Sequence, residues 1–459
     1  MSIPRPLEPP PVESAARSRG RFGAGAGPRL LLLVGAGLAW VIPALWNRTF
    51  LYAMLLWDVV LLLAFLGDLF HLPSPKQLTV RREWRSPLSI GVTSTLHLSV
   101  SNRSPVGIWA SAYDELPPSG RHEIRAILLA VPASSTRFAS CEYTPGTRGD
   151  LRAGKVFLRY RSRLQMAERW AIADLDQTVR AYPNFENSRK HSMYLARSRQ
   201  IELQTRLMRM RGTGSDFESL REYREGDEMR NVCWTAAARR GKLVSKTFRV
   251  ERSQAVWIVL DCGRLMRART DGYSKLDRAV DAALCVSQLA LYSGDRVGLM
   301  AYGRAVNQRV MPGRGAAQIR QIVEQLAVIR EEAPEADHVR AAASLLTLQR
   351  QRGLIIWISD LAETAMTPEV IEAAGQILSR HVLLFMVIAQ PELKERARQI
   401  PASTPAMYEV VAAQEMVYRR ELLLGRLRER GALCMEVEPS RISSAILNQY
   451  LSIKERNLV

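Results

Sequence analysis

The sequence predicts a multi-domain chain that combines a transmembrane α-hairpin, an antiparallel β-sandwich-like domain and an α/β domain with a doubly wound, mostly parallel sheet. Two long apolar runs near the start predict the hairpin. Polar–apolar alternation then predicts the β-rich domain, and alternating strand and helix patterns predict the α/β domain. The predicted parts are a disordered basic tail, the hairpin, the β-rich domain, a basic connector and the α/β domain, at residues 1–29, 30–70, 76–182, 184–252 and 253–459.

The composition is that of a folded protein with an excess of positive charge. Hydrophobic residues make up 47% and charged residues 24% of the 459, which excludes a mostly disordered chain. The formal net charge of +19 indicates a negatively charged partner, such as anionic lipid, nucleic acid or an acidic protein. Five widely spaced cysteines without a CxxC pair disfavour a disulfide framework or zinc cluster and favour a reducing compartment.

The tail and the hairpin are distinguished by their charges. Residues 1–29 contain five arginines among many Pro, Gly, Ala and Ser residues, which predicts disorder. Residues 30–46 and 50–67 are apolar runs near the lower length limit for spanning a membrane, and only three residues separate them. The pattern predicts two short membrane-spanning helices, and no small-x-small motif after residue 46 supports a cleaved signal peptide.

The basic residues around the hairpin predict its orientation. Five arginines precede the first run and one, Arg48, lies in the turn, whereas Lys76, Arg81, Arg82 and Arg85 follow the second run. By the positive-inside rule both ends are cytoplasmic, so the bulk of the chain faces the cytoplasm and membrane lipid is a partner.

One ionisable residue, Asp58, lies inside the second apolar run. A carboxylate within a membrane span is a functional candidate by default. The alternative, which we favour, is a packing contact in which Asp58 pairs with the first helix or with a helix of a partner.

Residues 76–182 read as short antiparallel strands. Residues 78–84, 96–102 and 108–116 alternate between polar and apolar positions, and Pro and Gly punctuate the segments between strands. Six to eight strands of this kind over about 100 residues are typical of an immunoglobulin-like sandwich. No catalytic pattern is found in this domain.

The C-terminal part alternates buried strands with amphipathic helices. Residues 255–261, 353–361 and 381–389 are apolar runs typical of central parallel strands. Asp261 and Asp360 stand at the carboxyl ends of two of these strands, which is where ligands of doubly wound sheets bind.

The basic connector carries a dense motif after a segment expected to be helical. Gly212 and Gly214 are only a weak indication of a phosphate-binding loop, because no Lys-Ser/Thr pair follows them. Acids and bases recur at helical spacing around a bulky aromatic residue, which suggests a buried clasp between domains. The motif residues are Gly212, Gly214, Phe217, Leu220, Arg221, Tyr223, Gly226, Asp227, Arg230, Trp234, Ala238 and Arg239.

The order and spacing of these residues resemble the signature of the bacterial domain-of-unknown-function 58 (DUF58) family. The resemblance extends over most of the chain, from about residue 29 to 440. It implies a bacterial inner-membrane protein with two spans and a von Willebrand factor A-like α/β domain. It further implies a partner, a MoxR-type AAA+ ATPase, with which such proteins are thought to assist the maturation of protein complexes.

The resemblance also implies a metal site, in degenerate form. Von Willebrand A-type domains hold a divalent ion through Asp-x-Ser-x-Ser, a Thr and a later Asp. Here Asp261 and Asp360 match, Asp337 falls near the Thr position, and Gly263 and Leu265 replace the two serines. The candidate metal residues are therefore Asp261, Asp337 and Asp360.

The loss of two hydroxyl ligands disfavours Mg²⁺, a hard ion that prefers oxygen. Arg264 and Arg267 add positive charge nearby, and we expect one of them to neutralise the two carboxylates in place of an ion. We expect no other cofactor, and partner recognition that needs no metal.

The sequence therefore favours a non-catalytic, membrane-anchored interaction or assembly factor facing the cytoplasm. An alternative is a membrane protein that binds nucleic acid or anionic lipid, suggested by the charge, although no nucleic-acid fold signature is found and we expect no nucleic acid. The least favoured alternative is a hydrolase, because GxxxxGK[ST], GxSxG and HExxH motifs are all absent.

Overall fold

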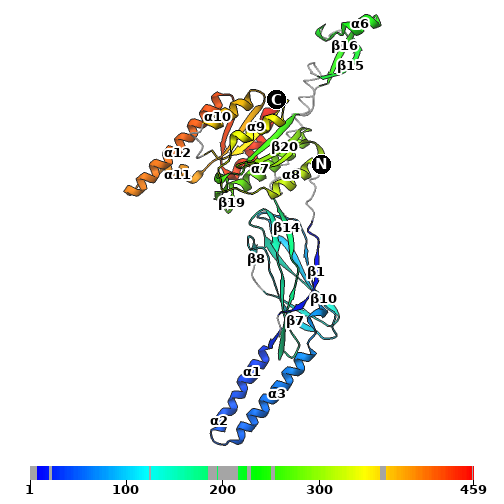
Figure 1. Ribbon diagram of the computed structural model, residues 1–459, viewed down its shortest axis with the longest axis vertical. Coiled ribbons are helices and arrows are strands. Elements are labelled where there is room, and N and C mark those ends of the chain that lie inside the picture. Colours follow the sequence, from blue (N-terminus) through cyan, green and yellow to red (C-terminus); the bar gives the residue numbers. More distant parts are fainter. Residues whose placement is uncertain are drawn as a thin grey trace. The chain divides into compact units, whose positions relative to one another are not determined.

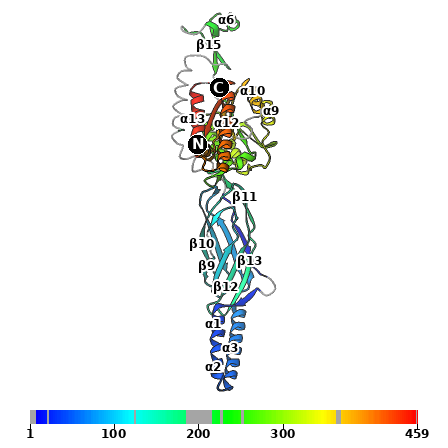
Figure 2. The same ribbon diagram turned by 90° about the vertical axis from the view of Figure 1, so that its left-hand side faces the viewer.

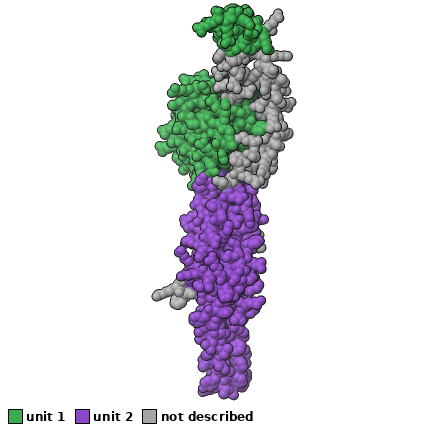
Figure 3. Space-filling model, turned by 90° about the vertical axis from the view of Figure 1, so that its right-hand side faces the viewer, with its two compact units in different colours: residues 1–4, 183–459 green, residues 5–182 purple. Residues whose placement is uncertain are grey.

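A computed structural model of the chain (Figure 1) describes residues 8–19, 23–122, 126–184, 194, 216–224, 229–249, 254–361, 368–456 and 458. It divides the chain into two compact units (Figure 3). The first described below comprises residues 5–182, and the other comprises residues 183–459 together with 1–4.

The described residues of the predicted disordered tail, 8–19 and 23–29, include three short strands. Strand β1 (Val12–Ala15) pairs antiparallel with β4 (Leu78–Trp84), whereas β2 (Arg17–Ser18) and β3 (Ala24–Ala26) pair with β13 (Ala167–Ala173). The Pro- and Gly-rich composition suggested disorder, but short segments can be held by the edges of an existing sheet, which offer free backbone hydrogen-bonding groups.

The two apolar runs form helices that lie side by side (Figures 1 and 2). The first comprises α1 (Pro28–Gly37), a 3-10 turn η1 (Leu38–Trp40) and α2 (Val41–Ala44); the second is α3 (Thr49–His71). By length and composition, α3 is the one helix among the described residues that could cross a membrane. The first apolar segment is shorter, so the structure supports one candidate span where the sequence predicted two.

The two helices approach closely at a glycine. A Cβ atom at Gly37 would lie 2.8 Å from Cδ1 of Trp57, so a larger residue there would force the helices apart. The Trp57 indole N–H donates to the carbonyl oxygen of Leu33 at 3.1 Å. A small residue facing a large one thus fixes the contact between α1 and α3.

The strands of this unit form two main sheets and one smaller sheet. Their orders are β1-β4-β6-β10-β8, β2-β13-β12-β7-β9 with β3 beside β13, and β11-β14-β5. The remaining strands are β5 (Leu88–Ser89), β6 (Ser94–Asn102), β7 (Ile108–Asp114), β8 (Arg121–His122), β9 (Ile127–Val131), β10 (Ser135–Thr144), β11 (Gly149–Ala153), β12 (Val156–Arg161) and β14 (Gln177–Tyr182).

Alternation explains why these sheets face one another. Every second residue of β6 is buried, as the sequence pattern predicts for a strand with one face in a core. Leu98 and Val100 of one main sheet share a hydrophobic core with Leu158 and Ala171 of the other. The result is a sandwich of antiparallel sheets.

One buried ion pair lies inside this sandwich. The guanidinium of Arg82 is fully buried and pairs with Asp114, and it also donates to the carbonyl oxygens of Leu175 at 2.8 Å and Gly154 at 2.9 Å. Arg82 therefore belongs to the domain core, and it should not be counted among the basic residues that flank the second apolar run.

The described part of the family motif lies on and between the strands of a small antiparallel hairpin in the other unit. Strands β15 (Asp216–Glu222) and β16 (Val244–Arg249) pair with each other, and η3 (Met229–Asn231) and α6 (Trp234–Arg240) lie between them in the chain. The helix expected over residues 189–211 lies outside the described residues, apart from residue 194.

The largest sheet of this unit is doubly wound, as predicted. Its order is β21-β20-β17-β22-β23-β24, and only the edge strand β21 is antiparallel to its neighbour. Numbered along the chain this is 3-2-1-4-5-6, the usual order of doubly wound sheets. The strands are β17 (Ala255–Asp261), β20 (Arg296–Tyr302), β21 (Val306–Gly313), β22 (Leu354–Ser359), β23 (Val382–Ile388) and β24 (Leu433–Val437).

Helices cover both faces of this sheet (Figure 1). Helices α7 and α13 pack against each other on one face, and α9, α10 and α12 pack on the other. A capping box between Ser274 and Asp277 starts α7. The helices are α7 (Lys275–Tyr292), α8 (Gly315–Val328), α9 (His338–Leu348), α10 (Pro368–Leu378), α11 (Pro391–Arg398), α12 (Thr404–Glu429) and α13 (Ile442–Glu455).

Candidate functional site

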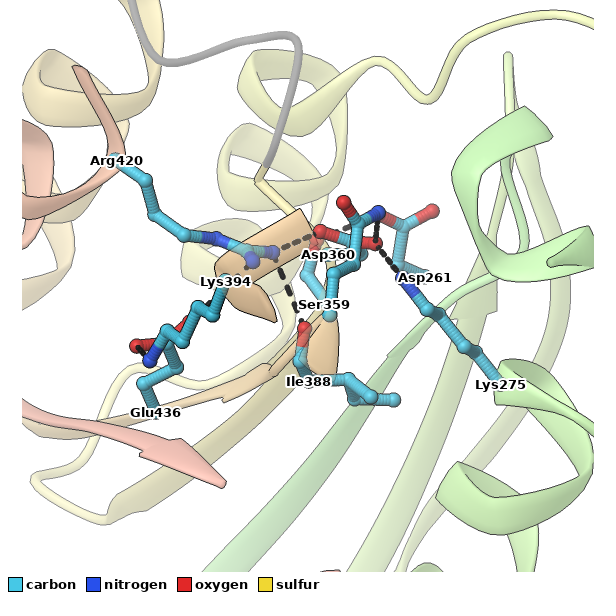
Figure 4. Close-up of polar contacts among 9 residues, drawn as sticks. Asp261, Lys275, Ser359, Asp360, Ile388, Lys394, Arg420 and Glu436 are labelled. Atoms are coloured by element: carbon cyan, nitrogen blue, oxygen red, sulfur yellow. Dashed lines mark hydrogen bonds and ion pairs between the residues drawn. The ribbon is translucent and has the colours of Figure 1, made fainter. Parts of the chain in front are cut away.

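The candidate site lies where two central strands of the doubly wound sheet end. Strands β17 and β22 are parallel neighbours, and Asp261 and Asp360 come at their carboxyl ends. The strand order reverses between these two strands, and in open α/β sheets this switch point is where ligands bind. Figure 4 shows the side chains that gather there.

Asp261 is held by hydrogen bonds from its immediate neighbourhood. One carboxylate oxygen accepts from the backbone N–H of Gly263 at 2.7 Å, and the other accepts from the Ser359 hydroxyl at 2.6 Å. The carboxyl is almost completely buried, and burial raises its pKa. Raising the pKa of a carboxyl means that the charged form is disfavoured here.

Close packing explains why a glycine, Gly263, stands two residues after Asp261. A Cβ atom at Gly263 would lie 2.8 Å from the backbone nitrogen of Ala336 and 3.1 Å from the Asp261 carboxylate. A serine at position 263 would therefore displace the neighbouring loop. In metal-binding domains of the von Willebrand A type, this position carries a serine whose hydroxyl is a metal ligand.

Asp360 is neutralised by two basic side chains from distant elements. It pairs with the ammonium of Lys275, the first residue of α7, and with the guanidinium of Arg420 from α12. The Gln390 amide donates to the same carboxylate at 3.0 Å. All three charged side chains are at most 3% exposed. Burial lowers the pKa of Lys275, and the charge of Asp360 counteracts this effect.

This finding corrects the expected source of the counter-charge. Arg264 pairs with Glu335 at 3.4 Å, and both side chains are about half exposed. Arg267 lies in the same 3-10 turn, η4 (Arg264–Arg267). The cations that contact Asp360 are instead Lys275 and Arg420.

The charged contacts continue from Asp360 toward the edge of the sheet. Arg420 also donates to Glu436 at 3.3 Å and to the carbonyl oxygen of Ile388 at 3.1 Å, and Lys394 pairs with Glu436 at 2.6 Å. We call Lys275, Asp360, Arg420, Glu436 and Lys394 the charge network. It connects α7, β22, α12, β24 and α11 through alternating signs (Figure 4).

The third candidate metal residue, Asp337, caps a helix. Its carboxylate accepts from the backbone N–H of Arg340 at 2.8 Å and pairs with the Arg340 side chain at 3.5 Å, at the start of α9. Over the part of the chain that the structure describes, no cluster of three or more His, Cys, Asp or Glu side chains suits a metal ion. The donors around Asp360 do not fit a divalent ion either, because a protonated lysine cannot act as a metal ligand.

A buried aromatic cluster beside the site was missed from the sequence. The Trp357 indole donates to the Tyr302 hydroxyl at 2.7 Å, and this hydroxyl lies 2.7 Å from Nδ1 of His338. The hydroxyl and Nδ1 therefore share one hydrogen bond, and the tautomer of His338 decides which of the two donates. Burial lowers the pKa of His338 and raises that of Tyr302 well above its usual value.

The family motif lies partly outside the described residues. This holds for Gly212, Gly214, Gly226 and Asp227, and for the side chains of Phe217 and Arg230. The described motif residues are half-buried or exposed: Leu220 and Tyr223 are half-buried, whereas Arg221, Ala238 and Arg239 are exposed.

The expected burial of the motif tryptophan is wrong. Trp234 is the first residue of α6, and its side chain is 61% exposed. A large aromatic side chain on the surface is available to a partner, whereas a buried clasp would have hidden it.

Asp58 is exposed on α3. Among the described residues we find no hydrogen bond or ion pair of its side chain with the first helix. A Cβ atom at Gly37 would lie 3.9 Å from Oδ1 of Asp58, so this side chain lies beside the first helix without a hydrogen bond or ion pair to it.

Comparison with known proteins agrees with the resemblance in part. Residues 219–405 match the family model described as "Protein of unknown function DUF58". Uncharacterized proteins of Mycobacterium tuberculosis and Mycobacterium bovis are 27% identical over 183 residues. This match covers 39% of the chain and 56% of each relative, so the chain spans about half the length of these relatives.

Two solved structures resemble parts of the chain. A conserved hypothetical protein BatB from Bacteroides thetaiotaomicron aligns at 14% identity with a TM-score of 0.31, over 44% of this chain and 100% of that protein. An uncharacterized membrane-spanning protein from Vibrio fischeri aligns at 14% identity with a TM-score of 0.17, over 43% and 96% of the two chains. At these scores neither likeness carries a structural argument.

Proposed function

We propose that this chain is a membrane-anchored interaction or assembly factor whose α/β domain, of von Willebrand A type, recognises its partner without a metal ion. The charge network carries this proposal. Lys275 and Arg420 supply at Asp360 the positive charge that a divalent ion would supply in a metal-dependent domain. The close packing around Gly263 supports the same conclusion, because it leaves no room for a hydroxyl ligand.

The proposed anchor is a two-helix hairpin in the bacterial inner membrane, with the bulk of the chain in the cytoplasm. The length and apolar composition of α3 support one span. The first segment reaches the lower length limit for a membrane-spanning helix only if it is counted from Pro28 to Ala44. It packs against Trp57 of α3 at Gly37.

The proposed partner is a MoxR-type AAA+ ATPase, and the proposed role is protein-complex maturation without catalysis by this chain. The family resemblance supports the partner. The exposed Trp234 on α6 supports a contact surface, because tryptophan is enriched among the residues that dominate binding energy.

The test is affinity capture by the full chain in detergent, from bacterial membranes and cytosol, with EDTA present and bound proteins identified by mass spectrometry. We expect an AAA+ ATPase to be captured. Trp234→Ala should weaken its capture by more than about tenfold and leave thermal unfolding unchanged. Arg240→Ala, on the same exposed helix, is the matched control and should retain capture.

Three results would contradict the proposal. Capture that contains no AAA+ ATPase would remove the partner, and capture that EDTA abolishes would remove metal independence. Recovery of nucleic acid alone, with affinity that falls steeply as salt rises, would favour the alternative suggested by the net charge.

A further inference from the structure

We propose that the end of the β-sandwich next to the helical hairpin is a binding site for the anionic phosphate headgroups of membrane lipids. The inference rests on the proposed membrane anchor and goes beyond it by naming a site and a lipid class. It depends on how segments far apart in the sequence meet at this end of one compact unit.

Both helices of the hairpin are bonded to one loop of the sandwich. The loop, residues 162–166, joins β12 to β13. Asp68, near the end of α3, accepts hydrogen bonds from the Ser162 hydroxyl and from the backbone N–H groups of Met166 at 3.0 Å and Ala167 at 2.9 Å. Just before α1, Gly27 donates its N–H to the Met166 carbonyl at 2.7 Å. The start of one helix and the end of the other are therefore fixed beside this loop.

Four exposed basic residues lie on the segments that meet here. Arg29, in the first turn of α1, reaches the carbonyl oxygens of Arg163 at 3.4 Å and Leu164 at 3.5 Å. Lys76 lies in η2 (Pro75–Gln77), which follows α3, and the N–H of Arg103 donates to the Gln77 carbonyl at 3.0 Å. We call Arg29, Lys76, Arg103 and Arg163 the basic collar.

The collar has no acidic neighbours in its own segments. Residues 27–30, 69–77, 103–107 and 161–166 contain no Asp or Glu. Two carboxylates bonded to this loop or next to it are buried: Asp68 accepts from the loop, and Glu168 pairs with Arg159 and Arg161. The exposed charged side chains of these four segments are therefore all basic.

The position of the collar points to lipid headgroups. On one side of it stand helices whose large apolar side chains are exposed, such as Leu31 at 63% and Leu62 at 55%. On the other side stands the sandwich. Headgroups would lie at this border, and each Lys or Arg close to an anionic surface contributes to binding.

Two exposed apolar side chains at the same end fit an interfacial position. Leu164 lies at the loop and is 60% exposed. Trp109 is 54% exposed and is paired across the sheet with Arg161, the last residue of β12. Tryptophan is enriched at the level of the headgroups, where its ring is partly in an apolar and partly in a wet environment.

The far end of the sandwich provides a matched control. Arg85, Arg121 and Lys155 are exposed cations at this far end. Arg85 directly follows β4 and Lys155 directly precedes β12, and the opposite ends of these two strands adjoin the hairpin. Arg121 pairs with Thr144, the last residue of β10. Arg85 and Lys155 have acidic neighbours, since Arg85 pairs with Glu83 at 3.5 Å and the N–H of Lys155 donates to Glu115. Removing these charges alters net charge as much as removing three charges of the collar does.

The experiment reconstitutes the full chain in vesicles that contain brominated phosphatidylglycerol or, at the same mole fraction, brominated phosphatidylcholine. Quenching of tryptophan fluorescence reports which lipid gathers around the protein. We expect stronger quenching by phosphatidylglycerol, reduced by NaCl. Lys76→Gln/Arg103→Gln/Arg163→Gln should lower the relative affinity for phosphatidylglycerol by more than about tenfold. Arg85→Gln/Arg121→Gln/Lys155→Gln should retain the preference.

The other outcomes are equally informative. Equal quenching by the two lipids, or a preference that the collar variant retains, would overturn the site. Inorganic phosphate that competes more strongly than NaCl of equal ionic strength would identify a soluble phosphate ligand and overturn the lipid assignment. Failure of the chain to float with vesicles of either lipid would refute the membrane anchor itself, which distinguishes that failure from loss of the site alone.

Discussion

At the scale of single residues, the central feature is a carboxylate that carries its own counter-ions. Asp360 contacts Lys275, 85 residues away in sequence, and Arg420, 60 residues away. Isolated buried charges are strongly disfavoured, whereas paired and hydrogen-bonded ones are tolerated. Removing one partner should therefore be worse for stability than removing an exposed pair.

Arg420→Leu tests this directly. It leaves Asp360 buried with less counter-charge and Glu436 without one of its partners, so we expect the free energy of unfolding to fall by roughly 3–5 kcal/mol. The measurement is denaturant unfolding of the full chain in detergent. Arg419→Leu, which breaks only an exposed pair with Glu415, is the control and should change stability by less than about 1 kcal/mol. Equal effects of the two variants would contradict the importance of the network.

His338 predicts a pH dependence with a defined sign. The pKa of a histidine in an unfolded chain is about 6.5. Burial lowers the pKa of His338 in the folded state. As pH falls the unfolded chain takes up the proton first, so the stability from this group is complete above about 6.5 and is lost as pH falls toward the folded pKa.

The variant His338→Gln should reduce this loss. We expect the wild-type melting temperature to fall between about pH 7.5 and about pH 5.5, and to fall less in the variant. The loss should not vanish, because burial also lowers the pKa of His381, which remains. A variant that loses as much stability as the wild type over this range would show that His338 does not contribute.

At the scale of elements, Asp68 determines how the hairpin joins the sandwich. Asp68→Ala would leave the Ser162 hydroxyl and two backbone N–H groups without their acceptor. We expect a loss of about 1–3 kcal/mol and faster tryptic cleavage at Arg163 of the detergent-solubilised chain. Asp58→Ala, at an exposed position of the same helix, should do neither. Unchanged cleavage in the Asp68 variant would mean that other contacts hold the loop.

Elements with a strong pattern could be predicted, and short or mixed ones could not. Residues 78–84 and 255–261 form β4 and β17 with the predicted bounds, because strict alternation and a continuous buried run leave few alternatives. Strands β1 to β3 were missed because they are short and depend on the edges of other strands for their hydrogen bonds. Local sequence contains little information on such long-range pairing.

The candidate site, too, could be predicted only as far as local sequence determines it. Asp261 and Asp360 could be placed together because parallel strands bring their carboxyl ends to one edge of the sheet. Lys275 and Arg420 could not be assigned to that edge, since their helices reach it only through tertiary packing. The choice of Arg264 and Arg267 followed sequence proximity to Asp261, and that criterion was wrong for this contact.

At the scale of the whole molecule, the proposed topology puts both ends of the hairpin in the cytoplasm. In a cysteine-free background, a cysteine introduced at position 48 should react with an impermeant reagent added to spheroplasts, and cysteines at positions 20 and 140 should react only after lysis. Labelling of position 140 from outside would place the sandwich on the other side of the membrane and remove the cytoplasmic ATPase as a partner.

The most direct test of the central claim is isothermal titration of the chelator-treated full chain with Mg²⁺ and with Mn²⁺. Because Lys275 and Arg420 already neutralise Asp360, we predict no saturable binding in the micromolar range by either ion. A micromolar dissociation constant that Asp261→Ala abolishes would contradict the account, because it would show that the two carboxylates hold a metal ion despite the basic side chains beside them.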